Sequence, residues 1–222
     1  MFELFRFNLK KDTGVFFNNK KNSIIKFGLT TRSKKKLNNE LKGYLWYINK
    51  NKKKKYFIIS KKNNYIELPL IKGKKFNFWD NFIFQKKKIN KIFKHYKDIW
   101  PKQSQVPFHG DLTLDNIVFL NQDSVFFIDW ENYKPKQEWG LDLCYFLISL
   151  IVLPSLALKQ KKINQNKLIL FSNLWEGLFK NKKYKYLNDP INYLKQIIKE
   201  KDSFLFKISP GTKKQIDNII NV

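Results

Sequence analysis

Short apolar runs separated by polar turns occupy the first third of the chain, and this pattern predicts β-strands. The expected strands cover residues 4–9, 15–17, 23–27, 56–60 and 65–71. Gly14 is expected in a turn before the second strand, and residues 61–64 in a turn before the last. Between the third and fourth strands, residues 33–47 place apolar side chains at helical spacing. The first 72 residues therefore predict a small α+β unit.

Helical periodicity dominates the rest of the chain. A break at residues 72–74 is followed by an amphipathic helix at 81–100. Two short strands, 117–120 and 125–128, are then joined by a turn at 121–123. Further helices are expected at about 141–158, 163–181, 190–201 and 212–221. This order predicts an α+β fold with a strand-rich region at 1–72 and a mainly helical region at 73–222.

Composition identifies a folded chain, because 43% of its 222 residues are hydrophobic and 17% are aromatic. The single cysteine, Cys144, excludes an internal disulfide and indicates a reducing, cytoplasmic environment. Residues 143–158 carry no charge, but they are short for a membrane span and contain Pro154, which favours a buried core helix. The first eleven residues lack the pattern of a secretory signal.

Lysine and arginine outnumber the acids by 44 to 18, which gives a formal net charge of +26. Such a charge raises the hypothesis of nucleic-acid binding. The lysines are spread through the whole chain beside many Asn, Ile, Phe and Tyr residues, as expected from an AT-rich coding sequence, and no RNA-binding motif accompanies them. We therefore expect no specific nucleic-acid partner, while a weak attraction to ATP or to an anionic membrane surface stays open.

The acids are concentrated in one segment. Seven of the 18 lie between residues 111 and 142, where only two lysines occur. The seven are Asp111, Asp115, Asp123, Asp129, Glu131, Glu138 and Asp142. An acidic segment in so basic a chain suggests the binding of a divalent metal through hard oxygen ligands.

Three polar residues in this segment have a spacing that suits one site. Asp111 and Asn116 precede the first strand of the expected hairpin, and Asp129 follows the second. Because a hairpin returns its ends to the same place, Asn116 and Asp129 can meet near one cation, with Asp111 facing an incoming hydroxyl. Taken singly, each of these residues is equally typical of a turn. Their combined arrangement favours phosphoryl transfer.

The His-Gly-Asp run that begins at His109, ends at Asn116 and is followed by the strand-end Asp129 resembles the catalytic core of the aminoglycoside phosphotransferase and choline kinase family. The resemblance implies a two-lobed, protein-kinase-like fold that uses ATP and Mg²⁺. It implies that Asp111 is the catalytic Asp, that Asn116 and Asp129 bind magnesium, and that His109 is a structural loop residue. Asp142, in a Trp-Gly-Leu-Asp-Leu segment, is implied to brace the catalytic loop.

The resemblance extends into the first lobe on fewer residues. Lys26, within an Ile-Ile-Lys-Phe-Gly run, is similar to the lysine that contacts the α/β-phosphates, and Glu40 on the next helix is implied to pair with it. The hinge, whose backbone would bind adenine, is implied to include Glu67, Leu68 and Leu70. Because lysine is so common in this chain, an ordinary surface role for Lys26 stays open.

Some features of the kinases are missing. No GxGxxG loop is present, the metal-binding Asp is followed by Trp-Glu, and no Ala-Pro-Glu motif occurs. These differences favour a kinase that acts on a hydroxyl of a small molecule, such as a sugar or an amino alcohol. Residues 143–222 hold 14 lysines and five acids, which favours a neutral or anionic acceptor over a polycationic one. A catalytically weak nucleotide-binding or scaffold protein is the alternative, and the acceptor and the oligomeric state stay open.

Overall fold

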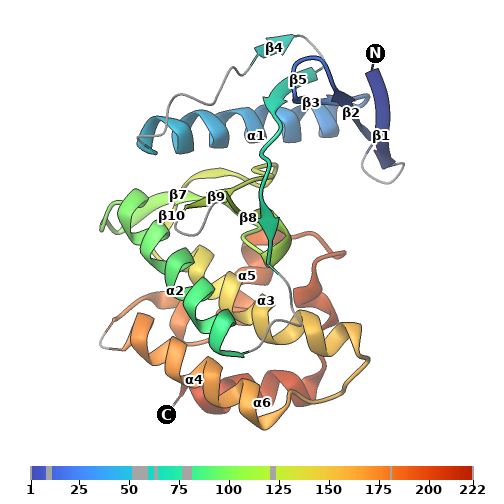
Figure 1. Ribbon diagram of the computed structural model, residues 1–222. Helices are drawn as coiled ribbons and strands as arrows, with labels where there is room; N and C mark the ends of the chain where they lie inside the picture. Colours follow the sequence, from blue (N-terminus) through green and yellow to red (C-terminus); the bar gives the residue numbers. More distant parts are fainter. Residues whose placement is uncertain are drawn as a thin grey trace.

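An antiparallel sheet of β1 to β5 opens the fold of the computed structural model, which describes residues 2–8, 12–51, 60–62, 65–76, 82–120, 124–180 and 182–221. The strands lie in the order β1-β2-β3-β5-β4 (Figure 1). They are β1 (Phe2–Asn8), β2 (Thr13–Asn18), β3 (Ser23–Gly28), β4 (Ser60–Lys62) and β5 (Tyr65–Pro69). In register, β3 pairs Lys26 with Val15 of β2 on one side and with Ile66 of β5 on the other. Lys26 therefore lies within the sheet, away from either edge.

Helix α1 (Thr31–Lys50) packs against β3 and β5. It begins at a capping box, in which the Thr30 side chain accepts from the Ser33 backbone and the Ser33 hydroxyl accepts from the Thr30 backbone. Leu37, Tyr44 and Tyr47 recur at helical spacing and are buried. The helix expected at 33–47 is thus confirmed and is longer at both ends.

Two smaller sheets are built from strands on either side of the long helix α2 (Phe82–Ile99) in the sequence. One has the order β6-β8-β9 and joins β6 (Lys74–Lys75), β8 (Ile117–Phe119) and β9 (Val125–Phe127). The other pairs β7 (Gln105–Phe108) with β10 (Lys134–Glu138). The 3₁₀ turn η3 (Leu114–Asn116) leads into β8, and α2 contacts β9. The segment between residues 108 and 130 starts at the end of β7 and contains β8 and β9, so both sheets fix its position.

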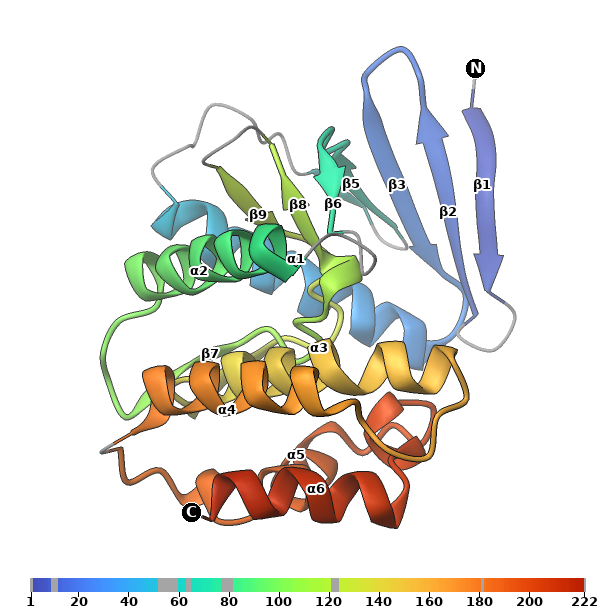
Figure 2. The same cartoon turned by 60° about the horizontal axis from the view of Figure 1, so that its bottom comes forward.

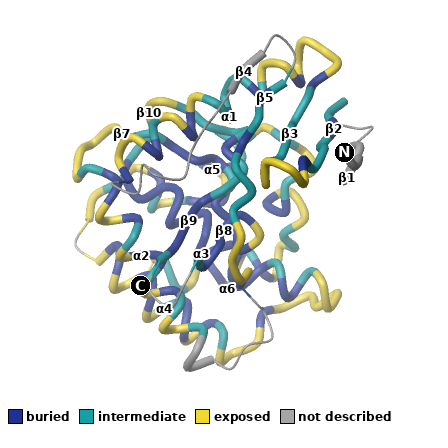
Figure 3. Tube along the Cα trace, turned by 45° about the horizontal axis from the view of Figure 1, so that its top comes forward, coloured by how far each residue is buried: buried dark blue, intermediate teal, exposed yellow. Residues whose placement is uncertain are grey.

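The C-terminal region is helical, with α3 (Leu141–Ala157), α4 (Gln165–Phe179), α5 (Pro190–Ile198) and α6 (Pro210–Ile220). Two 3₁₀ turns, η4 (Lys185–Leu187) and η5 (Phe204–Lys207), connect them. Helix α3 contacts α4, which contacts α6, so the three form successive layers (Figure 2). Helix α3 is buried on nearly all sides and lies with the β8–β9 hairpin in the deepest part of the core (Figure 3).

The chain therefore has an α+β fold, as the sequence predicts. The charge-free segment 143–158 is a buried helix, and none of the helices in the described part of the chain has the length and apolarity that a membrane crossing needs. The helices expected near 81–100, 163–181, 190–201 and 212–221 are confirmed within a few residues at each end.

Several local predictions need correction. Gly14 lies in strand β2, where a Cβ would be 1.9 Å from the Phe27 ring, so the close packing of that ring requires a glycine there. Lys61 and Lys62 lie in β4, β5 ends at Pro69, and the expected break at 72–74 overlaps β6, which pairs with β8. Residues 56–59, 63–64 and 121–123 lie outside the described residues. Strands β7 and β10 were not predicted, because each contains a proline and β10 is otherwise polar.

Candidate active site

The loop after β7 is held by the carboxylate of Asp142 at the start of α3. One carboxylate oxygen accepts from the backbone N–H of His109 at 2.9 Å, and the other accepts from the N–H of Gly110 at 3.1 Å. Gly110 has a φ of +83°, and a Cβ on it would be 2.5 Å from the Asn132 carbonyl oxygen. Both the conformation and the close approach require glycine at this position. The loop is thereby fixed on the N-terminal turn of a buried helix.

His109 is buried, and both of its ring nitrogens have partners within the loop. Its Nδ1 accepts from the backbone N–H of Asp111 at 3.3 Å, so the proton lies on Nε2, which donates to the Ile128 carbonyl at 3.0 Å. Burial lowers the pKa of the His109 imidazole to about 4, which keeps the ring neutral at physiological pH. A neutral ring with both nitrogens occupied positions the backbone and has no free atom for proton transfer.

The carboxylate of Asp111 is oriented by two donors. Tyr145 on α3 donates its hydroxyl to Oδ1 at 3.1 Å, and the Asn116 amide nitrogen donates to Oδ2 at 3.2 Å. The same amide nitrogen also donates to the Asp111 carbonyl at 2.7 Å. Because Nδ2 is held in this way, Asn116 presents Oδ1, the atom of its side chain that a hard cation would bind. Asp111 and Asn116 therefore form one connected unit.

The β8–β9 hairpin brings Asp129 to the same end as Asn116. Ile117 pairs with Phe127, and the N–H of Ile128 donates to the Asn116 carbonyl at 2.9 Å, so the two polar residues flank one end of the ladder. Asp129 has a φ of +65°, a left-handed conformation that Asp tolerates better than most residues. Its backbone N–H donates to the Tyr44 hydroxyl of α1 at 3.2 Å. The hairpin argument from the sequence thus matches the observed geometry of these two residues.

Lys26 joins three separate elements through its ammonium group. Its Nζ lies 2.6 Å from Oε1 of Glu40 on α1 and 2.8 Å from Oδ1 of Asp129 after β9. Burial alone would lower the pKa of Lys26, but the carboxylates of Asp129 and Glu40 raise it well above its ordinary value. Burial also raises the pKa of Glu40 to about 7, against the attraction of Lys26. The lysine is therefore a permanent cation between two acids.

The three expected hinge residues lie along β5 and are held by the sheet. The Glu67 carboxylate accepts from the Ser23 hydroxyl at 2.5 Å and lies 3.9 Å from the ammonium of Lys21. Leu68 pairs with Ile24, which places it on the same sheet face as Lys26. The N–H of Leu70 already donates to the Asn22 carbonyl at 2.8 Å. Their side chains and backbone thus take part in sheet contacts, and a role in adenine binding stays a prediction.

Some residues around the site were missed by the sequence reasoning, although three of them, all tyrosines, could have been found from helical spacing. Tyr44 lies one helical turn after Glu40, and Tyr145 lies one turn after Asp142, so each shares a helix face with an expected site residue. The Tyr47 hydroxyl, one turn beyond Tyr44, accepts from the N–H of Phe127 at 3.1 Å.

A fourth missed residue, Lys75, donates its ammonium to the carbonyl of Asp115. It reaches that position because β6 pairs with β8. A strand of two residues has no periodicity to read, so no local signal in the sequence announces this contact.

Among the described residues, no three His, Cys, Asp or Glu side chains gather as a ready metal site. A cation held by Asn116 and Asp129 would complete its shell with water and phosphate oxygens, as Mg²⁺ commonly does. The carboxylate oxygens of Asp129 and the amide oxygen of Asn116 are hard ligands of the kind that Mg²⁺ prefers. Neither a protein-family model nor a curated protein matches the chain. The chemistry of the site therefore has to be argued from its own residues.

Proposed function

We propose that this protein is an ATP- and Mg²⁺-dependent phosphotransferase that transfers the γ-phosphoryl group to a hydroxyl of a small molecule. One observation carries the proposal. Lys26 bonds both Glu40 and Asp129, and the adjoining Asp111 and Asn116 bond each other. A lysine, two metal-binding groups and a hydroxyl-orienting acid are the parts that phosphoryl transfer requires.

A two-lobed, protein-kinase-like arrangement is part of the proposal. In this interpretation residues 1–72 form the nucleotide-binding lobe, and residues 73–222 form the catalytic and substrate lobe. The order of elements supports it, since a sheet with one helix precedes a mainly helical region. Lys26 lies on the third strand and Glu40 on the helix that follows, the order that the resemblance implies.

The residues present fit a magnesium nucleotide. Asn116 and Asp129 supply oxygen ligands, and Lys26 supplies a fixed positive charge beside them. When bound, Mg-ATP supplies the phosphoryl group and neutralises charge on it. Asp111 accepts or orients the proton of the acceptor hydroxyl, and Tyr145 and Asn116 keep its carboxylate in one orientation. His109 holds the loop and takes no part in proton transfer.

The acceptor is best described by its charge. The 14 lysines and five acids of residues 143–222 favour a neutral or anionic sugar or amino alcohol over a polycationic molecule. The need for ATP and the single cysteine support a cytoplasmic location.

The decisive experiment is an ATP-dependent phosphorylation assay on a panel of sugars and amino alcohols. The isosteric change Asp111→Asn should lower kcat by roughly 100- to 10,000-fold, the usual worth of a positioned acid–base group. Binding of ATP should be unchanged, because Asp111 is assigned to the acceptor. Asp115→Asn is the matched control, since Asp115 is an exposed acid on the same loop.

Equal activity in wild type and Asp111→Asn would contradict the assigned role. If no acceptor is phosphorylated while ATP still binds, the alternative of a nucleotide-binding scaffold is favoured. One observation supports that alternative: Gly14, the sole glycine before Gly28, lies within a strand and packs on Phe27, so it is not placed as a flexible phosphate loop.

A further inference from the structure

A hollow lies between α2 and α4, away from the candidate active site. It has a volume of about 550 Å³, within the size range of small-molecule sites. Its apolar floor is formed by Phe93 of α2 and by Leu170, Leu174 and Leu178 of α4. None of the residues assigned to phosphoryl transfer lines it. The hollow therefore needs an explanation of its own.

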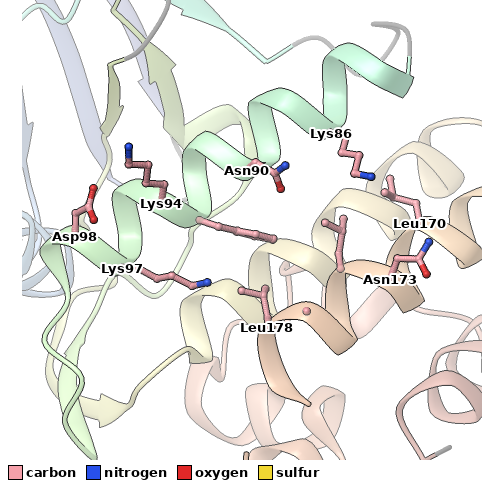
Figure 4. A pocket seen from close by; sticks show the side chains of 11 residues that line it. Lys86, Asn90, Lys94, Lys97, Asp98, Leu170, Asn173 and Leu178 are labelled. Carbon is pink, nitrogen blue, oxygen red and sulfur yellow. The ribbon is translucent and has the colours of Figure 1, made fainter. Parts of the chain in front are cut away.

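Lysines surround this floor on the α2 side. Lys86, Lys94 and Lys97 line the hollow, and within the described ranges no hydrogen bond or ion pair engages them. Asp98 is the single acid in the lining. Lys86 and Lys97 extend from α2 toward α4 at the two ends of the hollow (Figure 4). The lining thus has an excess of positive charge over an apolar surface.

Gly177 of α4 keeps the hollow open. A Cβ built on this glycine would meet no atom within 4 Å, so any larger side chain would project into free space at the hollow. A glycine within a helix lowers helix stability compared with alanine. Nothing in the packing of α4 requires glycine at this position. The effect of Gly177 is therefore to leave free space at the hollow, where a ligand could lie.

We infer that this hollow binds a small amphipathic anion whose apolar body lies on the Phe93 and leucine floor and whose phosphate group is held by Lys86 or Lys97. The charge of the lining selects an anion, and the leucine floor selects an apolar body. The two asparagines of the lining, Asn90 and Asn173, add hydrogen-bonding groups suited to phosphate oxygens.

Isothermal titration calorimetry of the full chain with octyl phosphate tests the inference. Inorganic phosphate lacks the apolar body and octyl glucoside lacks the charge, so both should bind much more weakly than octyl phosphate. The double change Lys86→Gln and Lys97→Gln should raise the Kd roughly tenfold, because it neutralises either lysine that could hold the phosphate. Gly177→Leu should abolish binding by filling the hollow without altering charge.

Lys87→Gln combined with Lys102→Gln is the matched control. Both lysines are exposed, neither lines the hollow, and the change in net charge is the same. This control should leave the Kd within about twofold of the wild-type value. Thermal melts of each variant verify that the fold is retained. The inference is overturned if octyl phosphate does not bind, if inorganic phosphate binds equally well, or if Gly177→Leu binds like wild type.

Discussion

Replacement of Lys26 by methionine tests how the charges of the site hold it together. The change keeps an apolar stem of similar length but removes the cation that lies 2.6 Å from Glu40. At that distance the gross attraction is about 6 kcal/mol at an effective dielectric constant of about 20. Because Glu40 is only 1% exposed, we expect a net loss of about 3–5 kcal/mol in the free energy of unfolding. Asp129 adds less, since its side chain is 35% exposed.

The addition of Glu40→Gln to Lys26→Met removes the buried charge that lacks a partner. The double variant should therefore recover about 2–3 kcal/mol relative to Lys26→Met alone at pH 8. The single variant should also regain stability on acidification. Burial already raises the pKa of Glu40 to about 7 beside Lys26, so a folded Glu40 without the lysine binds a proton more readily than the unfolded chain. Its stability is then lost as the pH rises above about 4.5.

Urea unfolding followed by tryptophan fluorescence measures these differences, because Trp130 is fully buried beside Asp129. Lys34→Met, an exposed change on the same helix, should alter stability by no more than about 0.5 kcal/mol. A coupling energy below about 1 kcal/mol between Lys26 and Glu40 would refute the reasoning. In that case packing, and not charge, would hold the strand, the helix and the hairpin end together.

Three further predictions concern single side chains. Burial lowers the pKa of His109 from 6.5 to about 4, so on acidification the unfolded chain binds a proton at this residue before the folded chain does. The stability of the wild type therefore falls as the pH drops below 6.5. Between pH 7 and 4.5, urea unfolding should show that the wild type loses about 2–3 kcal/mol more than His109→Gln. Gly43→Ala should lower the Tm, because the added Cβ would lie 2.7 Å from Cβ of the buried Trp130. Gly177→Ala should raise the Tm by the equivalent of about 0.5–1 kcal/mol, because its Cβ meets no atom within 4 Å and alanine favours the helix. Tyr145→Phe should lower kcat in the phosphorylation assay roughly five- to tenfold, the worth of about 1 kcal/mol of hydrogen bonding, and should cost no more than about 1 kcal/mol of stability.

Elements with a clear hydrophobic pattern could be predicted from the sequence. Helices α1 and α2 follow from helical spacing, and the β8–β9 hairpin follows from two short apolar runs joined by a turn. The buried helix α3 follows from its long uncharged run. Strands β7 and β10 could not be predicted, because Pro107 and Pro135 interrupt them and their pairing joins segments far apart in the chain. The place of Gly14 in β2 also escapes local reasoning, since it depends on the ring of Phe27 on the next strand.

The grouping of the loop and hairpin residues of the candidate site could be expected from the sequence, because these residues are close together in the chain. Asp111, Asn116 and Asp129 belong to one loop and one hairpin, whose geometry brings their ends together. Lys26 and Glu40 were named from a resemblance, and their meeting with Asp129 depends on how the sheet and α1 pack on the hairpin. Contacts of this long-range kind have no signature in sequence spacing.

Two tyrosine hydroxyls and one glycine attach helix α1 to the end of the β8–β9 hairpin. Tyr44 accepts from the backbone of Asp129, Tyr47 accepts from the backbone of Phe127, and Gly43 lies against Trp130. A rotation of α1 by one residue, about 100°, would break all three attachments at once. These attachments oppose a rotation of α1 relative to the end of the β8–β9 hairpin, and they hold Glu40 beside Lys26 without the help of any bound molecule.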